Sequence, residues 1–374
     1  MKVLILGVDG YIGWSLAQYL KAKGHQVRGV DNLLKAKIAA EDGSCSCIPQ
    51  LDLDEKSKQC GIPIERFDAG NLSLLNASLE EKPDVLVNLA QIAAAPYSMR
   101  GHAECLLTQE NNNRTNLAAL WALNQKCPDV PMVVIGSMGE YGTPAVDIPE
   151  GNFELEFRGR KDHCQFPRKP SSLYHSSKVA SSANCEFACR TWDLRITDIM
   201  QGVVYGTQAP GVEFPPAFWL DSCHGTALNR FCAQAVGGHP LTVYGTGQQR
   251  RGFLPLQDSL RCIELLCENP PESGEYRVVN QFDQPYTILE LAQAVQEIAG
   301  TYEELPEVTI QHLVNPRVEA DAHYYNPDRN KLVELGYEPQ GNLATGINQI
   351  LCDLLPHRER IAELAHLMMP RDLW

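Results

Sequence analysis

The chain has 374 residues and a formal net charge of −14, because 46 acidic residues outnumber 32 lysines and arginines. At about 100–200 residues per domain, this length predicts one large domain or two smaller ones. The acidic balance disfavours a nucleic-acid partner, since binding to phosphates over a broad face needs a basic surface. No stretch approaches the ~20 apolar residues that cross a bilayer, and the first residues lack the pattern of a signal peptide. We therefore expect a cytoplasmic protein that binds neither membranes nor nucleic acid.

The 13 cysteines are an odd number, in a chain too long to need disulfide bonds for its stability. The closest pairs, such as Cys45 with Cys47, form no CxxC motif, and the doublet His163–Cys164 stands alone. This pattern lacks the spacing of a zinc site. We expect free cysteines that act as small buried hydrophobic residues, and no metal site.

Short apolar runs alternate with amphipathic stretches over the first two hundred residues. The apolar runs predict strands at 3–6, 27–30, 62–67, 85–89, 132–135 and 196–200. The amphipathic stretches predict helices at 12–23, 72–80, 106–125 and 172–192. Nearly continuous apolar strands separated by helices are typical of a parallel sheet covered on both faces. The predicted fold class is therefore α/β: a doubly wound parallel sheet of the Rossmann type with a smaller C-terminal substrate-binding domain.

Two regions depart from this alternation. Residues 31–63 form a long polar excursion, which we expect to be a loop with a function of its own. From about Val203 the apolar alternation weakens, and helices are predicted at 226–236, 258–267, 288–299 and in the tail 342–374. We divide the chain into a domain at 1–202 and a second at 203–374, some of whose segments are able to return to the main sheet.

A glycine-rich turn follows the first predicted strand and opens the first predicted helix. Gly7, Gly10 and Gly13 allow a tight turn, close approach of the backbone to a pyrophosphate, and tight packing of helix on strand. Asp31 ends the second strand, where a carboxylate accepts both ribose hydroxyls and repels the 2′-phosphate of NADP. Asp68 follows the third strand, at the expected adenine end. These residues predict an NAD site.

A second group of residues predicts catalysis. Tyr174 and Lys178 are four residues apart, so they share one face of the helix predicted at 172–192. A lysine ammonium and a nicotinamide cation both favour tyrosinate, and we expect them to lower the pKa of the tyrosine towards neutrality. Ser137 ends the fifth strand and can hydrogen-bond the same substrate oxygen. This set predicts removal of a proton from a sugar hydroxyl while hydride leaves the same carbon.

With these residues in place, the sequence resembles the extended short-chain dehydrogenase/reductase family of nucleotide-sugar epimerases and dehydratases, and within it the sulfoquinovose synthases. The resemblance covers nearly the whole chain. It is carried by the motifs GVDGYIGW at 7–14, VDN at 30–32, APYSM at 95–99, SMGEYGTP at 137–144, SSLYHSSK at 171–178, QGVVYG at 201–206, GTALNRFCAQ at 225–234, GHPLTVYGTG at 238–247, RGFL at 251–254 and NPRVEADAHYYN at 315–326.

The resemblance implies a role for each matching residue. Ser137, Tyr174 and Lys178 would be catalytic. NAD would be held by Gly7, Gly10, Tyr11, Ile12, Gly13, Asp31, Asn32, Asp68, Ala69, Leu89, Asn112, Tyr174, Lys178 and Gln201. The nucleotide sugar, with UDP-hexose as the expected partner, would contact Met138, Gly139, Glu140, His175, Gln201, Asn229, Arg251 and Arg317. Asn112 would support the active-site backbone, and the two arginines would clamp the diphosphate, which suits the planar guanidinium.

The resemblance also implies the reaction. Members of the family oxidise C4 of the sugar, which makes the C5 proton acidic. The 4,6-dehydratases carry an acid and a base directly after the catalytic threonine, whereas this chain has Met138 and Gly139. That pattern is typical of the sulfoquinovose synthases, which eliminate water across C5–C6 of a UDP-glucose-like sugar and add sulfite. Glu140 is one candidate for the C5 base, beside a cysteine or water.

One departure keeps the second half of that reaction open. The synthases carry Glu-Gln-Arg-Ser before APYSM, and this chain has Gln91-Ile92-Ala93-Ala94. Loss of the guanidinium removes a charge-assisted contact to sulfite worth about 1.5–3 kcal/mol. The alternatives are a nucleotide-sugar 4- or 5-epimerase, or a 5,6-dehydratase that adds no sulfite.

Two further expectations concern class and assembly. A non-catalytic protein that keeps NAD as a structural or sensing ligand is the alternative outside the enzymes, although such proteins commonly lose the tyrosine or lysine. The family resemblance also implies a homodimer, formed through the helices predicted at 106–125 and 172–192.

Overall fold

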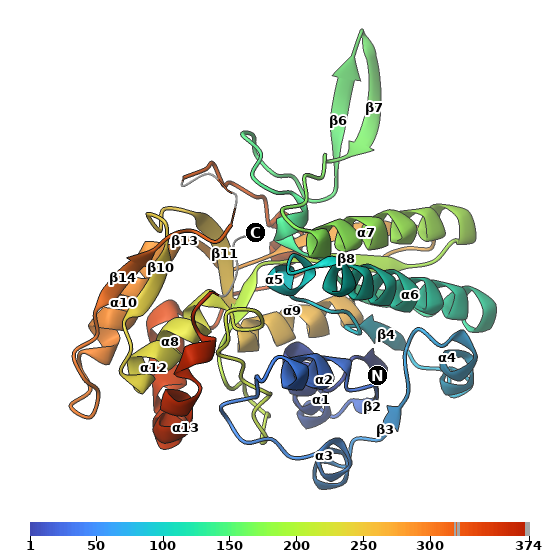
Figure 1. Cartoon of the computed structure of the whole chain (residues 1–374). Helices are drawn as coiled ribbons and strands as arrows, with labels where there is room; N and C mark the ends of the chain where they lie inside the picture. The colour runs from blue at the N-terminus through green and yellow to red at the C-terminus, as the bar shows by residue number, and fades with distance from the viewer. Residues whose placement is uncertain (318, 320–321, 371–374) are drawn as a thin grey trace.

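A computed structural model describes residues 1–317, 319 and 322–370. Its main sheet has seven parallel strands in the order β12-β8-β5-β4-β1-β2-β3 (Figure 1). They are β1 (Lys2–Leu6), β2 (Gln26–Asp31), β3 (Ile64–Arg66), β4 (Val85–Asn88), β5 (Met132–Ile135), β8 (Ile196–Gln201) and β12 (Tyr276–Gln281). All six strands predicted in the first two hundred residues are present. The Rossmann-type fold class is confirmed, because the strand order reverses at β1 as in doubly wound folds.

Helices cover both faces of this sheet (Figure 1). One face carries α1 (Tyr11–Ala22) and α9 (Leu256–Glu268), and the other carries α4 (Leu72–Ser78), α6 (His102–Lys126) and α7 (Leu173–Trp192). Alternate side chains of β1 serve the two faces: Val3 and Ile5 join the core under α1, whereas Leu4 and Leu6 join the core under α6. Burial on both faces explains why the strands are nearly continuous apolar runs.

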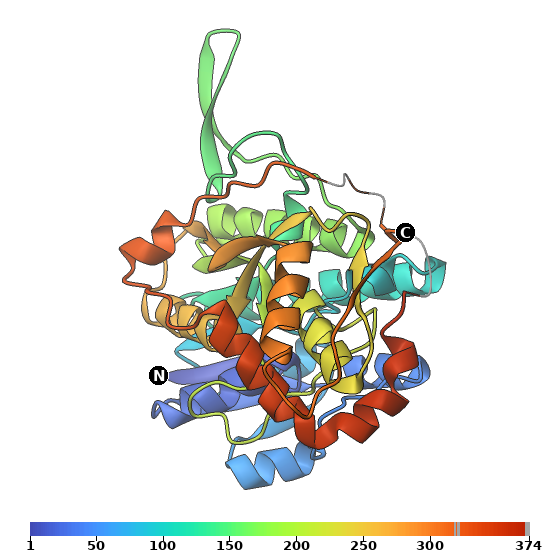
Figure 2. The ribbon, with the colours of Figure 1, turned by 90° about the vertical axis from the view of Figure 1, so that its left-hand side faces the viewer.

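The chain after residue 202 contributes to both parts of the molecule. Strand β12 pairs with β8 at the edge of the main sheet, and α9 packs against α1. The remaining segments form a smaller layer beside the sheet (Figure 2). Its strands are β9 (Val203–Tyr205), β10 (Leu241–Tyr244), β11 (Arg250–Pro255), β13 (Gln284–Thr287) and β14 (Ile310–Leu313), and its main helices are α8 (Ala227–Gly237), α10 (Ile288–Ala299), α12 (Leu343–Leu354) and α13 (Arg358–Glu363). The boundary at residue 202 remains a prediction.

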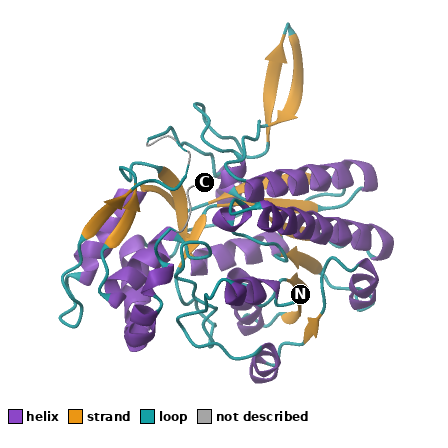
Figure 3. Cartoon of the chain, in the orientation of Figure 1, coloured by secondary structure: helices purple, strands orange, loops and turns teal. Residues whose placement is uncertain are grey.

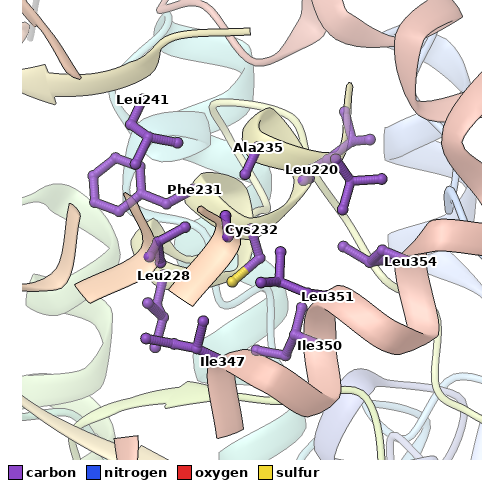
Figure 4. Close-up of a cluster of buried hydrophobic side chains, with 14 of the residues drawn as sticks. Leu220, Leu228, Phe231, Cys232, Ala235, Leu241, Ile347, Ile350, Leu351 and Leu354 are labelled. Carbon is purple, nitrogen blue, oxygen red and sulfur yellow. The ribbon is translucent and has the colours of Figure 1, made fainter. Parts of the chain in front are cut away.

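A separate hydrophobic cluster holds this smaller layer together (Figure 4). Helix α8 lies at its centre, and Phe231 and Cys232 are fully buried there. Helix α12 presents Ile347, Ile350 and Leu351 to the same cluster, at the spacing of one helical face. The tail therefore packs as part of the substrate-side layer, as far as residue 370. The end of the helix predicted at 342–374 lies outside the described residues.

The structure corrects the expectation of a loop at 31–63. This excursion contains two helices, α2 (Leu34–Glu41) and α3 (Leu53–Cys60). Asp52 caps the N-terminus of α3, because its carboxylate accepts a 2.9 Å hydrogen bond from the backbone N–H of Glu55. Helix α3 carries few apolar residues, and the apolar residues of α2 do not gather on one face, so hydrophobic periodicity did not reveal either helix, although Asp52 offered a capping signal for α3.

A second missed feature is the antiparallel hairpin formed by β6 (Asn152–Phe157) and β7 (Arg160–Gln165), which projects from the body of the protein (Figure 3). Its two-residue turn places Arg158 and Gly159 at φ +53° and +76°, the backbone geometry of a tight hairpin turn. Most of its side chains are exposed and many are charged, so the alternation of apolar and polar residues is weak. Two short helices, α5 (Ala95–Ser98) and α11 (Asn330–Glu334), complete the α-helices of the described residues. None of the described helices has the length and apolar character needed to cross a membrane.

The glycine turn gives a prediction about stability. A Cβ atom at Gly13 would lie 2.2 Å from the carbonyl oxygen of Gly7, whereas one at Gly10 would lie 3.2 Å from the same oxygen. We expect Gly13→Ala to lower the free energy of unfolding by about 1–3 kcal/mol, because backbone must move to relieve the clash. The matched variant Gly10→Ala should cost clearly less. Urea unfolding of both variants without added cofactor measures the difference, and equal losses would contradict the steric argument.

Candidate active site

The glycine-rich turn lies at the mouth of a cavity of about 510 Å³ at the carboxyl edge of the sheet. Gly7 has φ +81°, and a Cβ atom there would lie 2.7 Å from the carbonyl carbon of Leu89, so the turn approaches the end of β4 closely. Seven of the predicted cofactor residues line this cavity: Gly7, Gly10, Asp31, Asn32, Asp68, Ala69 and Leu89.

Carboxylates mark the two ends of the predicted adenosine site. Asp31 accepts hydrogen bonds from the backbone N–H groups of Asp9 at 2.8 Å and Leu33 at 2.7 Å, which fix its orientation. Burial raises the pKa of Asp31, and these N–H donors oppose that rise. Asp68 pairs with Arg114 at 2.6 Å.

The first turn of α1 contributes its backbone rather than its side chains. Tyr11 donates its hydroxyl proton to the carbonyl of Gly206 at 2.5 Å, and Asn229 accepts a 3.1 Å hydrogen bond from the N–H of Gly206. The side chain of Ile12 and the backbone of Gly13 pack within the fold and, like Tyr11 and Asn229, line neither described cavity. The amide of Asn229 holds the loop after β9, and its contact with substrate stays a prediction.

The excursion at 31–63 forms one wall of the cofactor cavity. Lys56 of α3 is buried and pairs with Asp9 of the glycine-rich turn at 2.6 Å. Lys35, Trp219 and Arg360 line the same cavity from three other segments. Sequence reasoning missed these four lining residues, since no motif connects them. The glycine cradle, Asp31 and the N-terminus of α1 together fit a dinucleotide with its pyrophosphate at the turn.

The predicted catalytic residues meet beside a second cavity of about 480 Å³. Ser137 ends β5 and begins the short 3-10 helix Met138–Glu140, and its hydroxyl accepts a 3.1 Å hydrogen bond from the N–H of Gly139. Ser137 and Tyr174 line the cavity, and Lys178 lies behind them with its ammonium 5.7 Å from the centre of the tyrosine ring. Ala93, Ala94 and His224 line both cavities, so the two cavities meet there.

Lys178 is buried and held by two acceptors. Its ammonium donates to the carbonyl oxygen of Ile135 at 2.5 Å and to the side-chain oxygen of Gln91. Burial lowers the pKa of Lys178 to about 8, and the nearby carboxylates of Glu140 and Asp198 limit that fall. The sequence motifs did not predict the contact between Gln91 and Lys178.

The expected lowering of the tyrosine pKa is not produced by the chain itself. Burial raises the pKa of Tyr174, and the carboxylate of Glu140 raises it further. The protein's own groups thus keep the phenol protonated, and tyrosinate formation requires the positive charge of the bound cofactor in addition to Lys178.

Glu140 takes a different place from the one predicted. It is fully buried, pairs with Arg168 at 2.8 Å, and accepts hydrogen bonds from the N–H of Ser137 at 2.9 Å and the hydroxyl of Ser182 at 3.1 Å. Burial and the carboxylate of Asp198 raise the pKa of Glu140 to about 7. The carboxylate of Glu140 is turned into this network, where it holds the N–H of Ser137, and it lines neither described cavity. Its contact with substrate and its role as the C5 base stay predictions.

His175 forms part of the substrate cavity together with Met138 and Gly139, as predicted. A Cβ atom at Gly139 would lie 2.2 Å from Nε2 of His175, so the imidazole needs a glycine beneath it. Burial and the charges of Arg317 and Arg251 lower the pKa of His175 to about 3. The ring is therefore neutral at physiological pH, with Nδ1 within 3.0 Å of the hydroxyls of Ser171 and Ser172.

Two predicted amides have different surroundings. Asn112 is buried beneath the cavities, where it bonds both the N–H and the carbonyl of Ile92, at 2.8 and 3.2 Å. It supports the backbone beneath the cavities and lines neither of the two described, and its contact with the cofactor stays a prediction. Gln201 lines the substrate cavity, and its amide donates to Ser259 and Gln281.

Three arginines also line the substrate cavity. Two of them are the predicted Arg251 and Arg317; Arg251 pairs with Glu319, and Arg317 is half-buried. Arg230 is a third, which sequence reasoning left unassigned within the motif GTALNRFCAQ. Its guanidinium lies 4.9 Å from the centre of the Tyr244 ring.

Several buried polar atoms of this cavity lack partners among the described residues. They are Nε of Arg230, the hydroxyls of Thr226 and Tyr244, and Oε1 of Gln249. Unpaired buried polar groups cost about 1–3 kcal/mol each. Four such atoms in one cavity, beside three arginines, fit a ligand that is polar and anionic.

Together the fold and the site define a class of protein. The chain matches the model of the NAD dependent epimerase/dehydratase family over residues 3–280. It belongs to this family, and it is an NAD-dependent enzyme.

Two relatives are similar over most of their length. The chain is 40% identical to UDP-sulfoquinovose synthase of Sulfolobus acidocaldarius, over all of this chain and 98% of that protein. It is 38% identical to the chloroplastic UDP-sulfoquinovose synthase of Spinacia oleracea, over 96% of this chain and 77% of that protein.

Solved structures share the fold. The UDP-glucose 4-epimerase of Thermotoga maritima, solved with UDP-glucose, has a TM-score of 0.70 at 19% identity and covers 94% of this chain and 97% of its own. The UDP-glucuronic acid 4-epimerase of Bacillus cereus, solved with UDP-glucuronic acid and NAD, has a TM-score of 0.70 at 21% identity. The match covers 97% of this chain and 100% of the epimerase chain.

The contact between Gln91 and Lys178 gives a prediction about pH. If catalysis requires the Lys178 ammonium, activity falls on the alkaline side as that group loses its proton, at a pKa of about 8. Gln91→Glu places a carboxylate against the Lys178 ammonium and raises the pKa of that lysine. We therefore expect the alkaline limb of the kcat/KM profile to move up by about 1–3 pH units. The exposed variant Gln125→Glu, with the same change of charge, should leave the profile in place. An unmoved limb in Gln91→Glu would contradict the assignment.

Proposed function

We propose that the protein modifies a UDP-hexose, with UDP-glucose as the expected substrate, through the first steps of sulfoquinovose synthesis. The observation that carries this proposal is the composition of the substrate cavity, which is lined by Ser137, Tyr174 and three arginines. The full-length similarity to two UDP-sulfoquinovose synthases supports the same substrate class.

The three arginines are suited to the nucleotide diphosphate. Arg230, Arg251 and Arg317 gather positive charge in a chain whose net charge is −14. Guanidinium groups bind phosphate oxygens in pairs, and Arg230 has a buried Nε that such a ligand would satisfy. The sugar would then extend towards Ser137 and Tyr174.

The chain's own residues handle the proton. Tyr174 would take the proton of the C4 hydroxyl as tyrosinate, while the Ser137 hydroxyl donates a hydrogen bond to the same oxygen. Lys178 would stabilise the tyrosinate through its charge, and Gln91 and the Ile135 carbonyl hold its ammonium in position. NAD, when bound in the adjoining cavity, supplies the hydride acceptor. The resulting C4 ketone acidifies the C5 proton, whose loss with the C6 hydroxyl as water would give a 5,6-unsaturated sugar.

The last step depends on the junction of the two cavities. Ala93 and Ala94 lie there, at the positions where the synthase pattern carries arginine and serine. Two small apolar side chains offer no charge to sulfite. A 5,6-dehydratase, or a 4- or 5-epimerase, is therefore the second candidate, and Met138 and Gly139 disfavour a 4,6-dehydratase because they supply neither acid nor base.

Incubation of the purified protein with UDP-glucose, with and without sulfite, separates these reactions. Mass spectrometry should show a sulfonated product if sulfite is the second substrate. Without sulfite, it should show loss of one water when the hydride returns to the sugar, and loss of two further hydrogen atoms when the 5,6-unsaturated 4-ketone is released before that return. An isomer of unchanged mass would indicate an epimerase. Each reaction should be abolished, with NAD retained, in the variants Ser137→Ala, Tyr174→Ala and Lys178→Ala. If the wild-type protein turned over no UDP-hexose, the proposal would be contradicted and an NAD-binding sensor favoured.

Arg230 gives a prediction about substrate affinity. We expect Arg230→Met to raise KM for the UDP-sugar about 10–100-fold with a smaller effect on kcat, because a charge-assisted contact is worth about 1.5–3 kcal/mol. Arg190→Met, which removes an exposed charge on α7, is the matched control and should leave KM unchanged. Steady-state kinetics at saturating NAD measures both. An unchanged KM in Arg230→Met would remove Arg230 from the diphosphate site.

We also propose that the protein acts as a cytoplasmic homodimer. Helices α6 and α7 pack side by side and expose large apolar side chains, among them Leu117, Trp121 and Phe187, which are 41%, 44% and 48% exposed. Two copies that meet through these helices would bury this apolar surface in a four-helix contact.

A further inference from the structure

A histidine lies where the two cavities meet. Among the described residues, Ala93, Ala94 and His224 line both the cofactor cavity and the substrate cavity, and His224 is the one of the three that can take up a proton. The sugar carbon that gives up hydride must lie at this junction, because the cofactor occupies one cavity and the sugar the other. In the proposed reaction that carbon is C4, and C5 is bonded to it. The imidazole of His224 therefore lines the part of the substrate cavity that C5 would occupy.

A buried carboxylate holds one nitrogen of this imidazole. Oδ1 of Asp221 lies 3.2 Å from Nδ1 of His224, and the two side chains are 7% and 3% exposed. The same oxygen accepts the backbone N–H groups of Cys223 at 2.9 Å and His224 at 2.8 Å, and the hydroxyl of Ser44 donates to the other oxygen at 2.8 Å. Nε2 of His224 has no hydrogen-bond partner in the part of the chain that the structure describes. With the ring proton on Nδ1, the lone pair of Nε2 can accept a proton, and Asp221 then stabilises the imidazolium.

Charges of both signs surround the ring. A carboxylate oxygen of Asp42 lies within 4.8 Å of a ring nitrogen of His224, and Asp42 pairs with Arg100. Lys35 is near Asp221; burial lowers the pKa of Lys35, and the carboxylate of Asp221 opposes that fall. Because Arg100 and Lys35 provide counter-charges for the two carboxylates, the imidazole need not be protonated to balance them. Nε2 therefore remains available as a base.

Helix α5 connects His224 with the predicted catalytic tyrosine. The centre of the Tyr97 ring on α5 lies 6.4 Å from the centre of the His224 ring. The hydroxyl of the next residue, Ser98, accepts the backbone N–H of Tyr174 at 2.9 Å. His224 and Tyr174 also line the same cavity. Proton transfer at the C4 oxygen and at C5 would thus take place in one cavity, between groups that pack on one short helix.

The other proton acceptors of the substrate cavity are less suited to this task. Besides His224, the carboxylate, imidazole and thiol groups that line it belong to Glu319, His175 and Cys223. Glu319 pairs with Arg251, at the proposed diphosphate site. Burial and the charges of two arginines lower the pKa of His175 to about 3, which makes its ring a weak base. Burial raises the pKa of Cys223 to about 12, so its thiol keeps its proton.

We propose that His224, oriented by Asp221, is the acid–base residue for the loss of water across C5 and C6, an inference that rests on the proposed function. Once C4 is a ketone, Nε2 would take the C5 proton, and the electron pair of the C–H bond would pass into an enolate. That pair would then form the C5–C6 double bond as the C6–O bond breaks. The imidazolium would give its proton to the departing hydroxyl, which leaves as water. The ring returns to its neutral form, and this step consumes no oxidant or reductant.

Single-turnover kinetics with UDP-glucose separate this step from the oxidation at C4. NADH absorbance reports the oxidation, and mass spectrometry of quenched samples reports the loss of water. We expect His224→Gln to slow the loss of water by about 10²–10⁴-fold while NADH formation falls far less, so that the 4-ketone accumulates. Asp221→Asn should also slow the loss of water, because an amide that donates to Nδ1 moves the ring proton to Nε2.

Matched variants make the test specific to the imidazole. His163→Gln removes an exposed imidazole on the hairpin, which lines neither described cavity, and should leave both rates unchanged. Added imidazole should restore the loss of water in His224→Ala, a rescue that a defect in folding would not allow. Circular dichroism checks that each variant is folded.

Two results would overturn the assignment. One is loss of water at the wild-type rate in His224→Gln or His224→Ala. The other is loss of water that disappears in Glu140→Gln and persists in the His224 variants, which would return the C5 base to Glu140. Wild-type protein that forms no NADH, or forms NADH and releases no water, would instead contradict the proposed function itself and this inference with it.

Discussion

The seven strands of the main sheet are parallel, and the active site depends on this constraint. Parallel strands place all their carboxyl ends at one edge, so residues that follow β1, β2, β4, β5 and β8 meet although they are far apart in the chain. Gly7, Asp31, Leu89 and Ser137 are each at or just after such an end. Helix α7 then crosses the same edge with Tyr174 and Lys178 in its first turns, which brings proton transfer next to the cofactor cavity.

Burial at this edge controls the chemistry more strongly than any single pair of residues. It raises the pKa of Tyr174, lowers that of Lys178 and keeps His175 neutral. Tyr174 and His175 are therefore uncharged, and the charge of the site comes from Lys178 and the arginines. Charge brought by the ligands has a large effect there, because charges interact more strongly in buried surroundings than in water. An acidic chain can bind two anionic ligands in this way, because its cations are gathered inside while its excess of carboxylates lies elsewhere.

Much of this arrangement was predictable from the sequence because it depends on local patterns. The strands of the Rossmann part are apolar runs, the glycine spacing is fixed by backbone contact, and the spacing of Tyr174 and Lys178 is fixed by the helix. What was missed depends on contacts between distant segments. Lys56 contacts Asp9, and Gln91 contacts Lys178, but no sequence spacing predicts either contact. The buried network around Glu140 was missed for the same reason, since its partner Arg168 and its neighbour Asp198 are distant from it in the chain.

The hairpin formed by β6 and β7 has a consequence for how the catalytic residues are connected. It lies in the chain between Ser137 and Tyr174, yet its two strands pair only with each other, and its ends return to the body close together. A change in its length would alter how far it projects without moving either residue, because Ser137 is fixed by β5 and Tyr174 by α7. The segment between two catalytic groups is thus mechanically separate from both. The chain can accommodate insertions or deletions there while the distance between the serine and the tyrosine stays constant.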